Sequence, residues 1–139
     1  MPSNVEIVEM PTNVEIVEMV SAAIARGDAL AIMGWVSRDI CWTAQAADRE
    51  AAPWFGVYRG KRGLLDLFAA FTTVEFTEVS HKAMVAQDDL VMTWVHVAFV
   101  GPTGRAAETD EVLIWRFADG KVVSVDVLFD TAAVASAFA

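Results

Sequence analysis

The sequence has little cysteine, little histidine and no concentration of positive charge. Cys41 is the single cysteine of the 139 residues, so it can form neither an intrachain disulfide nor a cysteine metal cluster, and we expect no metal and no cofactor. Ten Lys and Arg stand against 19 Asp and Glu, which gives a net charge of -9. Because binding to a phosphate backbone depends on clustered Lys and Arg, a nucleic-acid partner is excluded.

The sequence also lacks a long apolar run. Arg, Asp or Glu interrupts every apolar stretch before the roughly 18 residues of a membrane span, so we expect no membrane association. The N-terminal residues are acidic where an export signal is basic. These features predict a cytoplasmic protein in a reducing compartment, and the chain length is that of one domain.

Apolar residues, in contrast, are abundant. They make up 55% of the chain, with five Trp and eight Phe. This is more apolar material than a disordered chain carries. The excess predicts a lined pocket, an oligomer interface, or both.

The first half of the sequence has helical patterns. Thr12-Asn13-Val14-Glu15 has the form of a capping box, and apolar residues follow with helical spacing up to Gly27. Gly27-Asp28 then opens a second predicted helix over 29–36. A short strand over 39–43, a loop over 53–60 and a helix over 62–71 follow.

The second half alternates as β-strands do. Strands are predicted at 74–86, 90–100, 108–118 and 121–129, with turns at Asp88-Asp89, 101–104 and Asp119-Gly120. A short helix at 131–138 ends the chain. The order predicts an α+β domain, with a curved antiparallel sheet wrapped around three N-terminal helices.

The chain begins with a near-exact duplication. Residues 1–9 read MPSNVEIVE and residues 10–18 read MPTNVEIVE. In one helix the nine-residue offset would turn the two apolar sets to opposite sides, and Pro11 disfavours helix at Met10. We therefore expect residues 1–11 to be a duplicated N-terminal extension and residues 12–139 to be the single domain. Deletion of residues 1–9 should change the free energy of unfolding by less than about 1 kcal/mol.

Three segments in order resemble a known family. They are AAIARGDALAIMGWVSRDICW at 22–42, PWFGVYRGKRGLLDLFAAF at 53–71 and WRFADGKVVSVDVLFDTAAVASAF at 115–138. They resemble the SnoaL-like proteins of the nuclear-transport-factor-2-like superfamily, over roughly residues 12–139. The resemblance implies a cone-shaped α+β barrel around a deep pocket, and a homodimer paired through the outer face of the sheet.

The superfamily includes enzymes whose catalytic sets can be sought in this sequence. At the positions that resemble the acid–base set of ketosteroid isomerases stand Ala44, Val20 and Leu113. At those that resemble the set of limonene-epoxide hydrolases stand Val95, Val97 and Val127. None of these side chains transfers a proton, so both activities are expected to be absent.

Three other residues are candidate catalytic groups. Asp126 is the acid nearest to the general base of polyketide cyclases; it faces either the pocket or, by alternation with its neighbouring valines, the outer face. His96 is expected opposite His81 across a two-residue turn. The two histidines either bind a metal or transfer a proton, or form a pair on the outer face. Glu111 lies on the inner side of its strand, together with Leu113 and Trp115. It is either solvated at the rim of the pocket or desolvated and able to accept a proton.

Aromatic and aliphatic residues on the predicted inner face form the candidate pocket lining. They are Trp42, Trp54, Tyr58, Phe68, Phe71, Val95, Val97, Leu113, Trp115, Val125 and Val127. The lining predicts binding of a small hydrophobic molecule, ring-shaped, terpenoid or polyketide-like. The alternatives are a cofactor-free isomerase, cyclase or hydrolase that uses a pocket acid as general base, and an accessory protein whose cone is filled.

Overall fold

The structure is a computed structural model, and it describes residues 10–139. The first copy of the duplicated segment lies outside the described residues, so the expected extension stays a prediction. The second copy leads into helix α1 (Asn13–Ala25). Thr12 accepts a hydrogen bond from the Glu15 amide and Glu15 accepts one from the Thr12 amide, which confirms the predicted capping box.

The apolar side of α1 is buried, and the helix ends where the sequence predicts. Ile16, Val17, Val20 and Ala23 are each at most 2% exposed. Gly27 follows the helix with φ of +70°, the left-handed conformation that glycine adopts without strain. The spacing of these residues places α1 with one face against the core.

The second predicted helix is wrong. Asp28 accepts a hydrogen bond from the Ala31 amide, but only a single 3-10 turn, η1 (Leu30–Ile32), follows it. The carbonyl of Trp35 instead accepts from the Val122 amide, and strand β1 (Val36–Ala44) begins at the next residue. Pairing with the distant strand therefore ends the helical turn after three residues, and the domain does not have three N-terminal helices.

The predicted loop over 53–60 also contains structure. It forms strand β2 (Gly56–Arg59), which pairs with β1, and it leads directly into helix α2 (Gly60–Phe71). Helix α2 buries Gly63, Leu64, Leu67 and Phe68. A Cβ at Gly63 would lie 2.9 Å from the Tyr58 carbonyl carbon, so this helix packs closely against β2.

Four long strands follow, close to their predicted positions: β3 (Glu75–Gln87), β4 (Leu90–Val100), β5 (Ala106–Ala118) and β6 (Lys121–Phe129). The sheet order is β2-β1-β6-β5-β4-β3. The β1–β6 pair is parallel and the others are antiparallel, so the sheet is mixed, where the sequence predicts an antiparallel one. Helix α3 (Thr131–Ala135) and the 3-10 turn η2 (Ser136–Phe138) end the chain.

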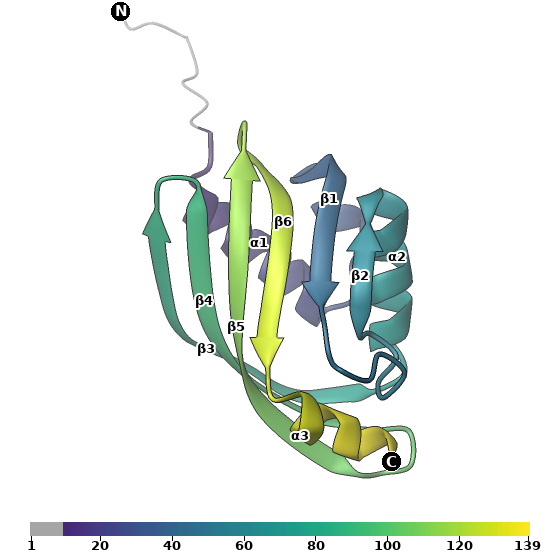
Figure 1. Cartoon of the computed structure of the whole chain (residues 1–139). Helices are drawn as coiled ribbons and strands as arrows, with labels where there is room; N and C mark the ends of the chain where they lie inside the picture. The colour runs from purple at the N-terminus through teal and green to yellow at the C-terminus, as the bar shows by residue number, and fades with distance from the viewer. Residues whose placement is uncertain (1–9) are drawn as a thin grey trace, which may run out of the picture.

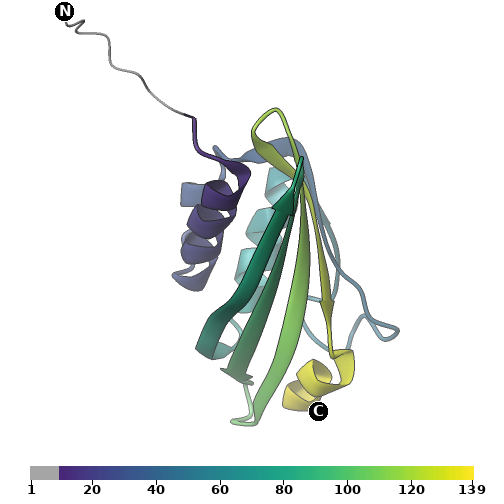
Figure 2. The same ribbon diagram turned by 90° about the vertical axis from the view of Figure 1, so that its left-hand side faces the viewer.

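The elements form two layers and a closed end. Helices α1 and α2 lie on the same side of the sheet (Figures 1 and 2). Helix α3 lies at one end of the sheet, where the long strands curve (Figure 1). Gly101, in the β4–β5 turn, has no room for a Cβ because the Ala137 carbonyl occupies that space. The core therefore lies between the inner face of the sheet and these helices.

Strand β3 is irregular at the edge of this sheet. Its pairing with β4 shifts between Phe76 and Glu78 and again between His81 and Ala83. Each shift inserts an extra residue, Thr77 or Lys82, and such bulges bend a strand and re-aim its side chains. The two bulges determine which residues of β3 face α1 and the core.

Candidate functional site

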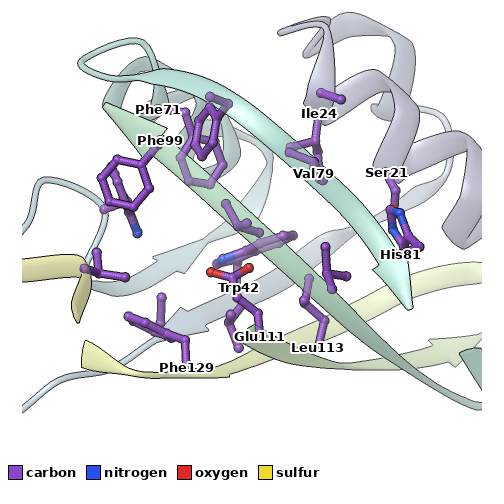
Figure 3. A pocket seen from close by; sticks show the side chains of 18 of the residues that line it. Ser21, Ile24, Trp42, Phe71, Val79, His81, Phe99, Glu111, Leu113 and Phe129 are labelled. Atoms are coloured by element: carbon purple, nitrogen blue, oxygen red, sulfur yellow. The ribbon is translucent and has the colours of Figure 1, made fainter. Parts of the chain in front are cut away.

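A pocket opens between the inner face of the sheet and the helices. It has a volume of about 100 Å³, and Figure 3 shows the side chains around it. Strands β3 to β6 provide one wall and α1 provides another, with Ser21, Ile24 and Ala25. At the β3 side Phe76 is 40% and Val79 42% exposed, so this side forms the mouth.

Aromatic rings make up much of the wall. Trp42 and Trp115 meet edge to face, with ring centroids 6.1 Å apart. Trp54 packs in the same way against Phe71, Phe99 and Phe138. The Trp115 indole N–H donates to the Thr93 hydroxyl at 3.2 Å, so the polar edge of this ring is satisfied inside the core.

Most of the predicted lining residues border this pocket. They are Trp42, Trp54, Phe71, Val95, Val97, Leu113, Trp115 and Val127. Phe68 and Val125 are buried in the core without bordering it. Tyr58 is also absent from the lining, and its hydroxyl donates to the Pro53 carbonyl. Sequence alternation gives the inward side of a strand but not which inward residues border an open space.

The positions compared with known catalytic sets are apolar and mostly face the pocket. Ala44, Leu113, Val95, Val97 and Val127 all line it. Val20, on α1, is 2% exposed and packs in the core. Proton transfer in this pocket therefore depends on other residues.

Glu111 is the acid that faces the pocket. In the sheet it lies between Val95 of β4 and Phe129 of β6, and all three border the cavity. Burial among these apolar neighbours raises the pKa of Glu111 to about 7, because the charged form loses its hydration. Glu111 is partly buried, and of the two placements that the sequence left open its raised pKa favours the desolvated one. At neutral pH such a group is present in both its acid and its base form.

Asp126 and His96 lie on the outer face. Asp126 accepts a hydrogen bond from Arg116 at 2.5 Å, and it pairs across strands with Ile114. His96 Nδ1 lies 2.6 Å from Asp110 Oδ1, and this hydrogen bond raises the pKa of His96. Neither side chain borders the pocket. As candidate catalytic groups they are therefore separated from Glu111 by the sheet.

The predicted pairing of His81 with His96 is wrong. A regular hairpin from Asp88-Asp89 would place them opposite each other, but the bulge at Lys82 shifts the register by one residue. His81 pairs with Val95 and lines the pocket, whereas His96 pairs with Ser80. Sequence reasoning missed His81 as a pocket residue because alternation carries no signal for a bulge.

Residues 10–139 contain no group of three His, Cys, Asp or Glu side chains placed to hold a metal ion. Within the same residues, no helix is long and apolar enough to cross a membrane.

Comparison with known proteins decides the family. A family model for the SnoaL-like domain matches residues 16–125. The chain belongs to the SnoaL-like family. No curated protein matches the sequence of this SnoaL-like chain.

Solved structures share the fold of this SnoaL-like chain. An NTF2-like protein from Burkholderia xenovorans LB400 is 29% identical, with a TM-score of 0.80 over 93% of this chain and 98% of that one. TerC, co-crystallised with polyporic acid, is 21% identical, with a TM-score of 0.79 over 89% and 95%. A candidate SnoaL-like polyketide cyclase from Mesorhizobium loti is 19% identical, with a TM-score of 0.69 over 85% and 99%. At these last two identities the likeness concerns the fold alone.

Proposed function

We propose that this SnoaL-like protein binds a small hydrophobic molecule that carries a ring. The observation that supports it is the pocket wall, in which Trp42, Trp54, Phe71 and Trp115 surround a space otherwise bordered mainly by aliphatic side chains. Flat aromatic walls suit a planar or ring-shaped ligand, because its faces replace water with close contact. Terpenoid and polyketide-like compounds are the classes that combine rings with this apolar character.

The size of the pocket limits the ligand. An apolar cavity of about 150 Å³ holds benzene, and this one measures about 100 Å³. The pocket is smaller than that cavity, so a single ring is the upper limit of what it encloses. A larger molecule extends past the exposed Phe76 and Val79 at the mouth.

A second candidate function is cofactor-free catalysis, as an isomerase, cyclase or hydrolase. It is favoured by Glu111, whose pKa of about 7 suits a general acid or base at neutral pH. Its carboxylate would take a proton from an activated C–H of the ligand, or, when protonated, donate a hydrogen bond to a ligand carbonyl. The structural likeness to TerC with polyporic acid and to the candidate polyketide cyclase is consistent with a ligand of this chemistry.

A ligand panel tests both functions. Steroid-like, terpenoid and aromatic compounds are screened for a rise in melting temperature of the wild type. Val97→Trp narrows the pocket and should abolish the rise, whereas Leu65→Ala, on the exposed side of α2, should retain it. If no class of compound raises the melting temperature of the wild type, ligand binding is refuted.

Catalysis is tested on the ligands that bind. In deuterium oxide, proton abstraction should exchange an acidic C–H of the ligand for deuterium, as followed by mass spectrometry. Glu111→Gln should bind the ligand but lose the exchange, because the amide accepts no proton. Equal exchange in both proteins would exclude Glu111 as the base.

We also propose that the partner of this chain is a second copy, bound through the outer face of the sheet. Trp94, Val112 and Leu128 lie in one cross-strand row on that face and are 47%, 36% and 58% exposed. Such a row leaves apolar surface in water unless another surface covers it. The cytoplasmic location remains a prediction from the composition.

A further inference from the structure

Polar groups are few in the pocket lining. Apart from the indole N–H groups, the lining side chains that the structure describes offer only Ser21, His81 and Glu111 as polar contacts. Two of these, His81 and Glu111, share one cross-strand row: His81 pairs with Val95, Val95 pairs with Glu111, and Glu111 pairs with Phe129. All four side chains in this row border the pocket.

The row fixes the spacing of the two polar groups. Neighbouring strands lie about 4.8 Å apart, so two spacings place the backbones of His81 and Glu111 roughly 10 Å apart, with Val95 between them. A hydrogen bond at each end takes up about 2.8 Å. Because strand side chains stand roughly perpendicular to the sheet, a ligand that bonds to both residues needs its two hydrogen-bonding atoms roughly 4 Å apart or more. Polar groups on non-adjacent ring carbons meet this requirement, and groups on adjacent carbons do not.

The bulge at Lys82 creates this arrangement. Without the extra residue in the register, His81 would face outward beside His96 and the row would have only one polar end. Bulges commonly re-aim a side chain next to a binding or active site. His81 lies at the mouth side, near α1, whereas Glu111 lies farther in on the sheet (Figure 3). His81 is thus exposed to solvent, whereas Glu111 is partly buried.

We propose that His81 and Glu111 bind opposite ends of a single-ring ligand that carries hydrogen-bonding groups on non-adjacent ring carbons. This inference rests on the proposed binding function and adds the substitution pattern of the ligand. The apolar side chain of Val95 supports the face of the ring between the two groups. A ring with adjacent polar groups reaches only one end of the row.

Isomeric probes test the proposal. The dihydroxybenzenes 1,4, 1,3 and 1,2 have the same composition and differ only in spacing, and phenol offers a single polar group. The affinities for the wild type are compared by isothermal titration calorimetry. The 1,4 or the 1,3 isomer should bind at least about fivefold more tightly than the 1,2 isomer and phenol, since one additional hydrogen bond contributes about 1 kcal/mol or more.

The two histidines provide an internal control. With histidine labelled in the ring, the bound 1,4 or 1,3 isomer should shift the His81 resonances and leave those of His96, on the outer face, unchanged. His81→Phe should reduce the affinity for that isomer to the level of phenol, and His81→Gln should restore part of it. These readouts report on a contact rather than on folding, because His81 is exposed.

The outcomes separate this inference from the function on which it rests. If all four probes bind equally well and the His81 resonances do not move, the two-ended arrangement is wrong, while ligand binding stands. If neither these probes nor any compound of the wider panel binds, ligand binding fails and this inference fails with it.

Discussion

Glu111 is an ionisable residue among apolar neighbours, and its position makes the free energy of unfolding depend on pH. Its pKa is raised by burial from 4.5 to about 7, so the native state holds the proton more tightly than the unfolded chain does. Below about pH 4.5 both states are protonated, and Glu111 has no effect. Between about pH 4.5 and 7 the unfolded state alone releases the proton, which favours unfolding.

Glu111→Gln should therefore remove a pH-dependent loss of stability. We expect the free energy of unfolding of the wild type to fall relative to the variant as the pH rises from 4 to 8, by up to about 3 kcal/mol, at about 1.4 kcal/mol per pH unit. Urea unfolding of both proteins across this range measures the difference. A difference that stays constant with pH would contradict the raised pKa.

The hydrogen bond from Trp115 to Thr93 gives a second prediction about stability. Thr93 and Trp115 are each 1% exposed. Thr93→Val keeps the shape but leaves the indole N–H without its acceptor, which should reduce the free energy of unfolding by about 1–3 kcal/mol. In a Trp115→Phe background, which lacks the donor, the same substitution should have little effect. Equal losses in both backgrounds would show that the hydrogen bond contributes nothing.

For the individual helices and strands, the sequence predicted an element where residues close together in the chain form its hydrogen bonds. The capping box predicted the start of α1, and alternation with turn residues predicted the four long strands. The second helix failed because a pairing partner more than 80 residues away, Val122, ends the turn before Val36. The register of β3 was mispredicted for a similar reason, since the bulge at Lys82 depends on how β3 curves against β4.

The capping box also yields a prediction for α1. Thr12→Ala removes the hydroxyl that accepts from the Glu15 amide at 3.2 Å. The loss should reduce the free energy of unfolding by about 1 kcal/mol. Thr12→Ser keeps the hydroxyl and serves as the control in chemical denaturation. Two variants of equal stability would argue against a role for the cap.

For the whole molecule, the resemblance predicted the SnoaL-like family, which the family model confirms. Periodicity predicted only the separate helices and strands. Periodicity alone gave an antiparallel sheet, because every hairpin turn joins antiparallel neighbours. The parallel β1–β6 pair brings together strands that no short turn connects. The inward side of the strands was predictable, and so were Trp42, Trp115 and Glu111 as inner-face residues. The volume of the space between them depends on packing that alternation does not describe.

The outer face gives a prediction for the assembly. If a second copy covers the row of Trp94, Val112 and Leu128, the wild type should sediment with twice the mass of one chain. Trp94→Glu should sediment as a monomer, because it places a charge in the apolar interface. Leu65→Glu is the matched control: Leu65 is 43% exposed, similar to Trp94, but lies on α2. A wild type that sediments as a monomer would refute the dimer.

The pocket holds an acid that should exchange a proton at neutral pH, and the binding and catalytic roles proposed for Glu111 depend on it. Carbon-13 NMR of glutamate-labelled protein tests it directly, with Glu111→Gln to assign the resonance. We predict one carboxyl resonance that titrates with a midpoint near 7 and is missing from the variant. A Glu111 resonance that titrates near the ordinary value of 4.5 would show that the pocket does not raise the pKa of this carboxyl group.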